Sequence, residues 1–171
     1  MSDKESENPA PSQSAKNEPW RQLYRYWLSK HVDGRPPSRE DIDPITEIPR
    51  LVANLMLIDA TADGFIYRFI GSEIVARTGQ DMTGVRAGFS RQFVASQSDW
   101  VAALNAVRTT QQARLIVSRF DKQATARLAV LLLPLHTKPG TVTKILGGTF
   151  YGGYFPPDIK VEGISEMEVP A

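Results

Sequence analysis

The sequence of 171 residues contains no cysteine and only two histidines, His31 and His136. Without cysteine there can be no disulfide, no thiolate nucleophile, no cysteine-ligated zinc or iron–sulfur centre, and no cysteine adduct to a flavin. A metal site needs three or four ligands, and the two histidines stand far apart in the chain with no other ligand beside either. The sequence therefore predicts neither a metal site nor a cofactor.

A charge excess of one sign and a long apolar run are also missing. Twenty basic residues oppose 19 acidic ones, which leaves a net charge of +1 and no overall field to attract nucleic acid. The longest apolar run, LAVLLLPL at 128–135, is far shorter than the roughly 20 residues that cross a bilayer. The N-terminus lacks the apolar core of a secretory signal. We therefore expect a cytoplasmic protein without a nucleic-acid partner or a membrane span.

No arrangement of residues indicates catalysis. No serine stands in the Gly-x-Ser-x-Gly context of a hydrolase nucleophile, and neither histidine is placed to activate one. The stretch GSEIVARTG, at 71–79, lacks the spacing and the lysine of a phosphate-binding loop. We therefore expect that the protein is not an enzyme.

The length suits a single domain. Residues 1–17 are rich in serine, glutamate, asparagine, lysine and proline, and we expect a disordered tail there. Residues 18–153 carry the helical and strand patterns of the domain. Residues 154–171 are rich in proline and glutamate and are expected to form a loosely attached tail.

The domain has the pattern of an α+β fold. An amphipathic helix is expected to begin at Pro19, and a longer helix to follow Ser96 or Ser98. Short turns between neighbouring strands force antiparallel pairing. The pattern predicts a five-stranded antiparallel sheet with short helices on one face, in addition to the N-terminal amphipathic helix. The expected strands are 55–60, 65–70, 113–120, 125–135 and 144–153.

The N-terminal helix has an aromatic face, in which Trp20, Leu23, Tyr24 and Trp27 recur at helical spacing. Two interpretations of this face remain open. It packs on the sheet of its own chain, or Trp20, Tyr24 and Trp27 form a homodimer interface, since aromatic residues are enriched at interfaces.

Three glycines, Gly71, Gly79 and Gly84, are expected to mark the ends of short elements after the second strand. Gly71 is expected to end the strand, and Ser72 to cap the helix that follows. Gly79 is expected to end that helix in the left-handed conformation, and Gly84 to end the next turn.

The second predicted strand carries three aromatic residues, Phe65, Tyr67 and Phe69, at alternate positions. A period of two places them on one face and Arg68 on the other. The aromatic residues either fill the core or line an apolar cavity, the usual form of a small-molecule site. Arg68 either holds a ligand carboxylate or pairs with an acidic residue of the domain. The cavity hypothesis names Tyr67, Phe69, Met82, Phe89, Phe93, Leu104 and Leu131.

Three blocks of the chain, in order, resemble a bacterial PAS-domain family. FIYRFIGSEIVARTGQDMTGVRAG (65–88) is similar to the YR-hydrophobic-IG-T-E-I…G-D-hydrophobic-T-G signature of PAS-domain proteins common in proteobacteria. The blocks YWLSKHVDGRPPSREDIDPITEIPRLVANLMLIDA and LAVLLLPLHTKPGTVTKILGG resemble the stretches before and after it. The resemblance covers roughly residues 20–153. Two departures are Ser72, where threonine is usual, and Pro37, where leucine is more frequent.

The resemblance implies a single-domain PAS module that senses or relays a signal through contact with other signalling proteins. Its short helices would wall a cavity able to take a small apolar ligand. Because no output domain is expected, a partner would carry the output. The chain lacks the helix-borne histidine of haem-binding PAS domains. The alternative is a constitutive dimerisation or scaffold module whose cavity is filled by its own aromatic side chains.

Overall fold

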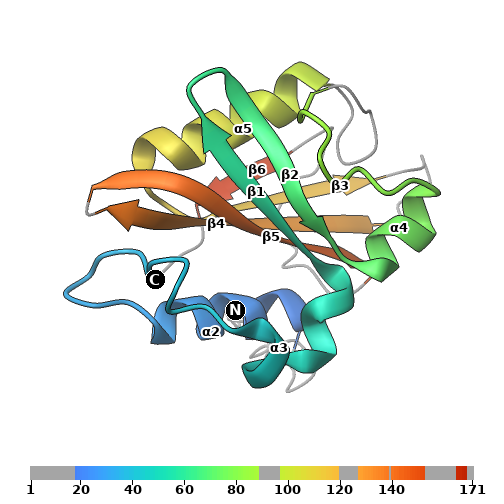
Figure 1. Ribbon diagram of the computed structural model, residues 1–171. Coiled ribbons are helices and arrows are strands. Elements are labelled where there is room, and N and C mark those ends of the chain that lie inside the picture. Colours follow the sequence, from blue (N-terminus) through green and yellow to red (C-terminus); the bar gives the residue numbers. More distant parts are fainter. Residues whose placement is uncertain (1–17, 89–96, 120–126, 139, 153–164, 169–171) are drawn as a thin grey trace, which may run out of the picture.

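The computed structural model describes residues 18–88, 97–119, 127–138, 140–152 and 165–168. They form one antiparallel sheet in the order β2-β1-β5-β4-β3-β6, with helices on both sides (Figure 1). The strands are β1 (Leu55–Thr61), β2 (Gly64–Ile70), β3 (Arg114–Arg119), β4 (Arg127–Lys138), β5 (Thr141–Tyr151) and β6 (Ser165–Glu168). The helices are α2 (Pro19–Ser29), α3 (Pro44–Glu47), the 3-10 helix η1 (Pro49–Asn54), α4 (Ser72–Thr78) and α5 (Gln97–Thr110).

The five predicted strands are confirmed to within a few residues, and the structure adds a sixth. β6 pairs with β3 at the edge of the sheet, within the range expected to be a C-terminal tail. This strand has only four residues, SEME, three of them polar, so the sequence carries no hydrophobic alternation long enough to predict it.

Two hydrophobic cores lie on opposite faces of the sheet. On one face, which we call the α5 face, α4 and α5 cover a core that includes Tyr67, Ile74, Met82, Trp100 and Leu104. On the other, the α2 face, the helix α2 packs on β4 and β5. The α2-face core includes Trp20, Leu23, Trp27, Leu131 and Leu146. Figure 1 shows α5 and α2 on opposite sides of the sheet.

The aromatic face of α2 packs on the sheet of its own chain, the first of the two interpretations above. Trp20 and Trp27 are both buried, and the Trp27 indole Nε1 donates a hydrogen bond to the Pro134 carbonyl oxygen of β4 at 3.0 Å. Pro19 occupies the first helical turn, where its missing N–H costs no helical hydrogen bond. Helix and sheet are therefore joined by a buried polar contact as well as by apolar packing.

A β-bulge in β2 changes which face its side chains occupy. Leu57 of β1 pairs with Phe69, but the next residue, Ile58, pairs with Tyr67, so Arg68 is the extra residue. The predicted common face of the three aromatic residues is therefore wrong. Tyr67 is 1% exposed, whereas Phe69 is 41% exposed and lies on the α2 face.

Gly71 joins β2 to α4 at a point of close backbone packing. A Cβ atom there would lie 2.3 Å from the Ala53 carbonyl oxygen of η1. Gly71 is itself the N-cap, and Ser72 is the first residue of α4 with no side-chain capping hydrogen bond, so the predicted capping role of Ser72 is wrong. The helix therefore starts one residue earlier than predicted, and the close approach of η1 requires glycine at position 71.

The other two glycines have the predicted roles. Gly79 ends α4 in the left-handed conformation with φ 73°, and Gly84, at φ 84°, follows in the next turn.

Replacement of Gly71 by alanine should lower the free energy of unfolding by about 1–3 kcal/mol, since the new methyl group meets a fixed backbone. The matched change Gly79→Asn should cost less, because asparagine tolerates the left-handed conformation and no atom lies within 4 Å of its Cβ position. Urea denaturation of the variants measures both effects. Equal stability of the two variants would contradict the packing constraint at Gly71.

Candidate functional site

The structure divides the seven residues of the predicted cavity between two faces. Tyr67, Met82 and Leu104 lie together in the α5-face core, each at most 1% exposed. Phe69 and Leu131 lie on the α2 face, so their inclusion was wrong. Phe89 and Phe93 fall outside the described residues.

The two misplaced residues have different physical reasons. Phe69 is displaced by the bulge in β2. Leu131 belongs to β4, whose described residues from Leu128 to Leu135 are buried on both faces. A strand that is apolar on both sides has no alternation from which to assign a face.

The α5 face contains few polar atoms within its apolar core. The Trp100 indole Nε1 donates a buried hydrogen bond to the Tyr67 hydroxyl oxygen at 2.7 Å, which ties α5 to β2. Burial raises the pKa of Tyr67, so the hydroxyl stays neutral at physiological pH.

Thr149 of β5 is a further polar residue on this face, in addition to Tyr67 and Trp100. It pairs with Val130 of the α5-face core and is fully buried. Its backbone carbonyl accepts a hydrogen bond from the Asn54 side-chain amide at 3.0 Å, but its hydroxyl has no partner among the described residues. Leaving a buried hydroxyl without a partner costs free energy. Threonine is ordinary in strands, so the sequence carried no signal for this position.

The opposite face has an open apolar groove. Helix α2 packs on β4 and β5, and the surface of β1 and β2 beyond it is uncovered. The groove has a volume of about 380 Å³, within the usual range for binding sites. Its lining consists of Arg39, Ile42, Asp43, Pro44, Ile45, Val52, Leu55, Leu57, Phe69 and Leu146. Of these, sequence reasoning had considered only Phe69 as a site residue.

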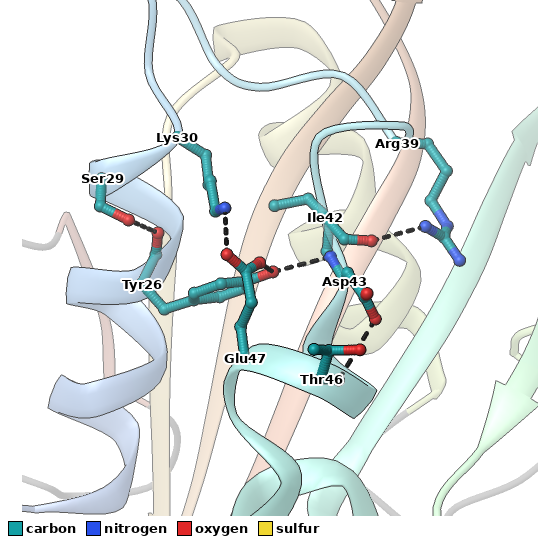
Figure 2. A network of polar contacts seen from close by, with 8 residues as sticks. All are labelled: Tyr26, Ser29, Lys30, Arg39, Ile42, Asp43, Thr46 and Glu47. Atoms are coloured by element: carbon teal, nitrogen blue, oxygen red, sulfur yellow. Dashed lines mark hydrogen bonds and ion pairs between the residues drawn. The ribbon is translucent and has the colours of Figure 1, made fainter.

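A polar network fixes one wall of the groove, the segment that leads into α3 (Figure 2). The Tyr26 hydroxyl of α2 donates to Glu47 Oε2 at 2.7 Å and accepts from the Asp43 backbone N–H at 2.8 Å. Lys30 forms an ion pair with Glu47. The Arg39 side chain donates to the Ile42 carbonyl oxygen at 2.8 Å. The wall is therefore attached to α2 and formed in advance of any occupant.

The charged groups of this network perturb one another. Hydrogen bonds from Lys30 and then Tyr26 lower the pKa of the Glu47 carboxyl group. Burial, followed by the hydrogen bond to the Glu47 carboxylate, raises the pKa of Tyr26. At neutral pH the network therefore contains an ionised Glu47 and a neutral Tyr26.

A cluster of three charged residues lies on the same face of β1, β2 and β5. Asp59 accepts hydrogen bonds from both Arg68 and Lys144, so Arg68 pairs within the domain, one of its two predicted roles. Burial raises the pKa of Asp59, but the two hydrogen bonds outweigh it and the net shift is downward. We call this cluster the Asp59 triad; its two cations and one anion leave one positive charge.

The residues predicted to form a dimer interface are mostly covered by their own chain. Trp20 and Trp27 are 4% and 3% exposed. Tyr24 is half-buried and stacks on Trp27 with 5.8 Å between ring centroids. A homodimer through this helix stays a prediction, and Tyr24 is the residue of the three that is accessible to a partner.

The family model for the PAS domain matches residues 15–150. The chain belongs to the PAS domain family. The predicted PAS membership is thus confirmed, and PAS domains are generally sensory or signalling modules. No curated protein matches the chain. None of the described helices is long and apolar enough to cross a membrane. No group of three or more histidine, aspartate or glutamate residues that could hold a metal ion occurs in the described ranges.

Replacement of Glu47 by glutamine should destabilise the protein at pH 7 and should matter less in acid. The pKa of Glu47 is lowered from 4.5 in the folded state, so its contribution is present above pH 4.5 and is lost as the pH falls through the lowered value. The free energies of unfolding of wild type and variant should therefore converge below that pH. Urea denaturation of both proteins at a series of pH values between 7 and 3 measures the difference in unfolding free energy.

The exposed Glu40 offers the matched control, and Glu40→Gln should follow the wild-type profile. A difference between Glu47→Gln and wild type that stays constant from pH 7 to pH 3 would show that the ionised carboxylate does not hold the wall.

Proposed function

We propose that this chain is a cytoplasmic, non-catalytic PAS regulatory module that holds a small, largely apolar molecule at its α5 face and relays its presence to a partner protein. The observation that carries the proposal is the buried hydroxyl of Thr149, which has no hydrogen-bond partner within the described part of the chain. Leaving such a group unsatisfied costs about 1–3 kcal/mol. A ligand with one polar atom would remove that cost, which supports a binding role for this face.

The chemistry around Thr149 favours an apolar ligand. Small-molecule sites are mostly apolar, with a few polar groups that fix orientation. Here the core around Thr149 is built from aliphatic and aromatic residues, and the polar groups are its hydroxyl and the Tyr67–Trp100 pair. Apart from tyrosine and tryptophan, Thr149 is the only polar or charged residue that is buried among the described residues, so the desolvation of a strongly charged ligand here would not be compensated.

A route for the relay runs from β5 to α4. Tyr151 lies two residues beyond Thr149 on the same strand and packs against the α5-face core. The Arg77 guanidinium of α4 lies over the Tyr151 ring at 5.0 Å and also pairs with Glu73. A ligand that moves this part of β5 would shift α4, and it can do so only to the extent that it binds one arrangement better than the other.

The alternative is a constitutive dimerisation or scaffold module with a self-filled core. It is favoured by the complete burial of Tyr67, Met82 and Leu104, whose side chains occupy the space that the cavity hypothesis assigned to a ligand. In this alternative the chain binds its partners in the same way at all times, and Thr149 tolerates loss of its hydroxyl.

Replacement of Thr149 by valine separates the two functions, because valine keeps the shape and removes the hydroxyl. We expect a co-purifying small molecule in the native mass spectrum of the wild-type protein, and its loss from Thr149→Val. Relative to the ligand-bound wild type, the variant should also lose about 1 kcal/mol of unfolding free energy, because the hydrogen bond between ligand and hydroxyl is gone. Thr149→Ser keeps the hydroxyl and should retain the ligand. A ligand-free wild type together with a Thr149→Val variant of equal or greater stability would contradict the proposal and support the scaffold.

A further inference from the structure

The apolar groove on the α2 face continues into a second hollow beside α4. Both hollows are lined by Val52 and Phe69, so these two side chains form the ridge between them. The second hollow is lined further by the apolar Ile70, Val75 and Ala76 and by the polar Ser72 and Asp81. Together they make a longer, mainly apolar surface, whose lining includes residues of α3, η1, β1, β2 and α4.

The surface exposes large apolar side chains together. Ile45 is 73% exposed and Phe69 is 41% exposed, and both line the groove. Neighbouring Leu57 and Val52 are half-buried. Single exposed apolar residues are ordinary, but a contiguous group rimmed by charge is typical of a protein interaction site.

The shape of the surface selects a helical occupant. Its floor is the face of the sheet. Backbone N–H and C=O groups within the sheet are already paired with neighbouring strands, so a partner cannot bind here by adding a strand. The free edge of β2 is also paired. The Tyr67 backbone N–H donates to the Val85 carbonyl oxygen, and the Tyr67 backbone carbonyl accepts from the Gly84 N–H. Two hollows on either side of a ridge instead suit an amphipathic helix, which presents apolar anchors at i, i+4 and i+7.

Charge complementarity defines the polar side of that helix. Asp59 follows Leu57 by two residues and Lys144 precedes Leu146 by two, so the Asp59 triad, with its one excess positive charge, adjoins the floor. Arg39 adds a cation at the rim. The Asp43 carboxylate is directed to the Thr46 N–H at the start of α3. The first hollow is therefore bordered by three cations and two anions, whereas the second is lined by one anion, Asp81, so acidic partner residues are expected beside the first hollow only.

We propose that this surface binds an amphipathic helix of a partner protein, with apolar anchors in the two hollows and acidic side chains beside the Asp59 triad and Arg39. The proposal rests on the proposed relay function for its biological role. The two can fail separately, because the ligand test at Thr149 concerns the opposite face of the sheet.

A displayed library of 18-residue helices tests the proposal directly. Positions i, i+4 and i+7 carry Leu, Ile, Met or Phe, and the flanking positions are left open. Sorting against the full-length chain should enrich aspartate and glutamate at the flanking positions at least threefold over lysine and arginine. Recovered helices, made as labelled peptides, should bind at least tenfold more weakly to Ile45→Ser, as measured by fluorescence anisotropy.

Two further variants complete the design. Val32→Ser removes an aliphatic side chain that is 67% exposed and lies outside the groove, so it should leave affinity within twofold of wild type. Arg68→Gln should reduce the preference for acidic flanking residues, while the apolar anchors remain selected. Circular dichroism verifies that each variant keeps its fold.

Three results would overturn the proposal: no helix recovered, enrichment of basic flanking residues, or equal affinity for wild type and Ile45→Ser. Self-association of the wild-type chain that Ile45→Ser abolishes, seen by sedimentation, would also overturn it, since the surface would then be covered by a second copy.

Discussion

The single extra residue in β2 determines what each face of the sheet can do. Because Arg68 is bulged out of the pairing with β1, Tyr67 stays on the α5 face and Phe69 turns to the α2 face. Tyr67 can therefore accept the buried hydrogen bond from Trp100, while Phe69 becomes the ridge between the two open hollows. The same bulge brings Arg68 to Asp59. A strictly alternating strand would have placed all three aromatic residues on one face and removed Phe69 from the groove.

The second constraint is the incomplete cover that α2 gives to its side of the sheet. A helix of 11 residues is about 16 Å long and cannot span all the strands of a sheet whose neighbours lie 4.7–4.9 Å apart. Its anchors, such as Trp27 with the Pro134 carbonyl, fix it over the middle strands. The surface of β1 and β2 is left to the short α3 and η1 segments, which the Tyr26–Glu47–Asp43 network holds to α2. The open groove thus follows from helix length and from where the helix is attached.

The sequence was sufficient for five of the six strands, for the order of the elements that it predicted and for the family, because each depends on local patterns. Alternation in β2, the apolar run of β4 and the glycines after β2 are readable within a few residues of chain. The faces of Phe69 and Leu131 were predicted wrongly, since a bulge and a doubly buried strand break the link between alternation and burial. The capping role of Ser72 was predicted wrongly because Gly71 is the N-cap of α4 and Ser72 already lies within the helix. The groove could not be predicted either, because it depends on which part of the sheet α2 leaves uncovered.

The two candidate sites are joined by β5, which is central in the sheet and contributes to both faces. Thr149 faces the α5 side, whereas its neighbours Gly148 and Phe150 face α2. A Cβ atom at Gly148 would lie 2.4 Å from the Leu23 side chain, so α2 rests almost directly on the backbone of β5. Close-packed contacts transmit small displacements instead of absorbing them. A shift of β5 caused by a group bound at Thr149 would therefore reach α2 within one residue of chain, and through Tyr26 and Glu47 it would reach the wall of the groove.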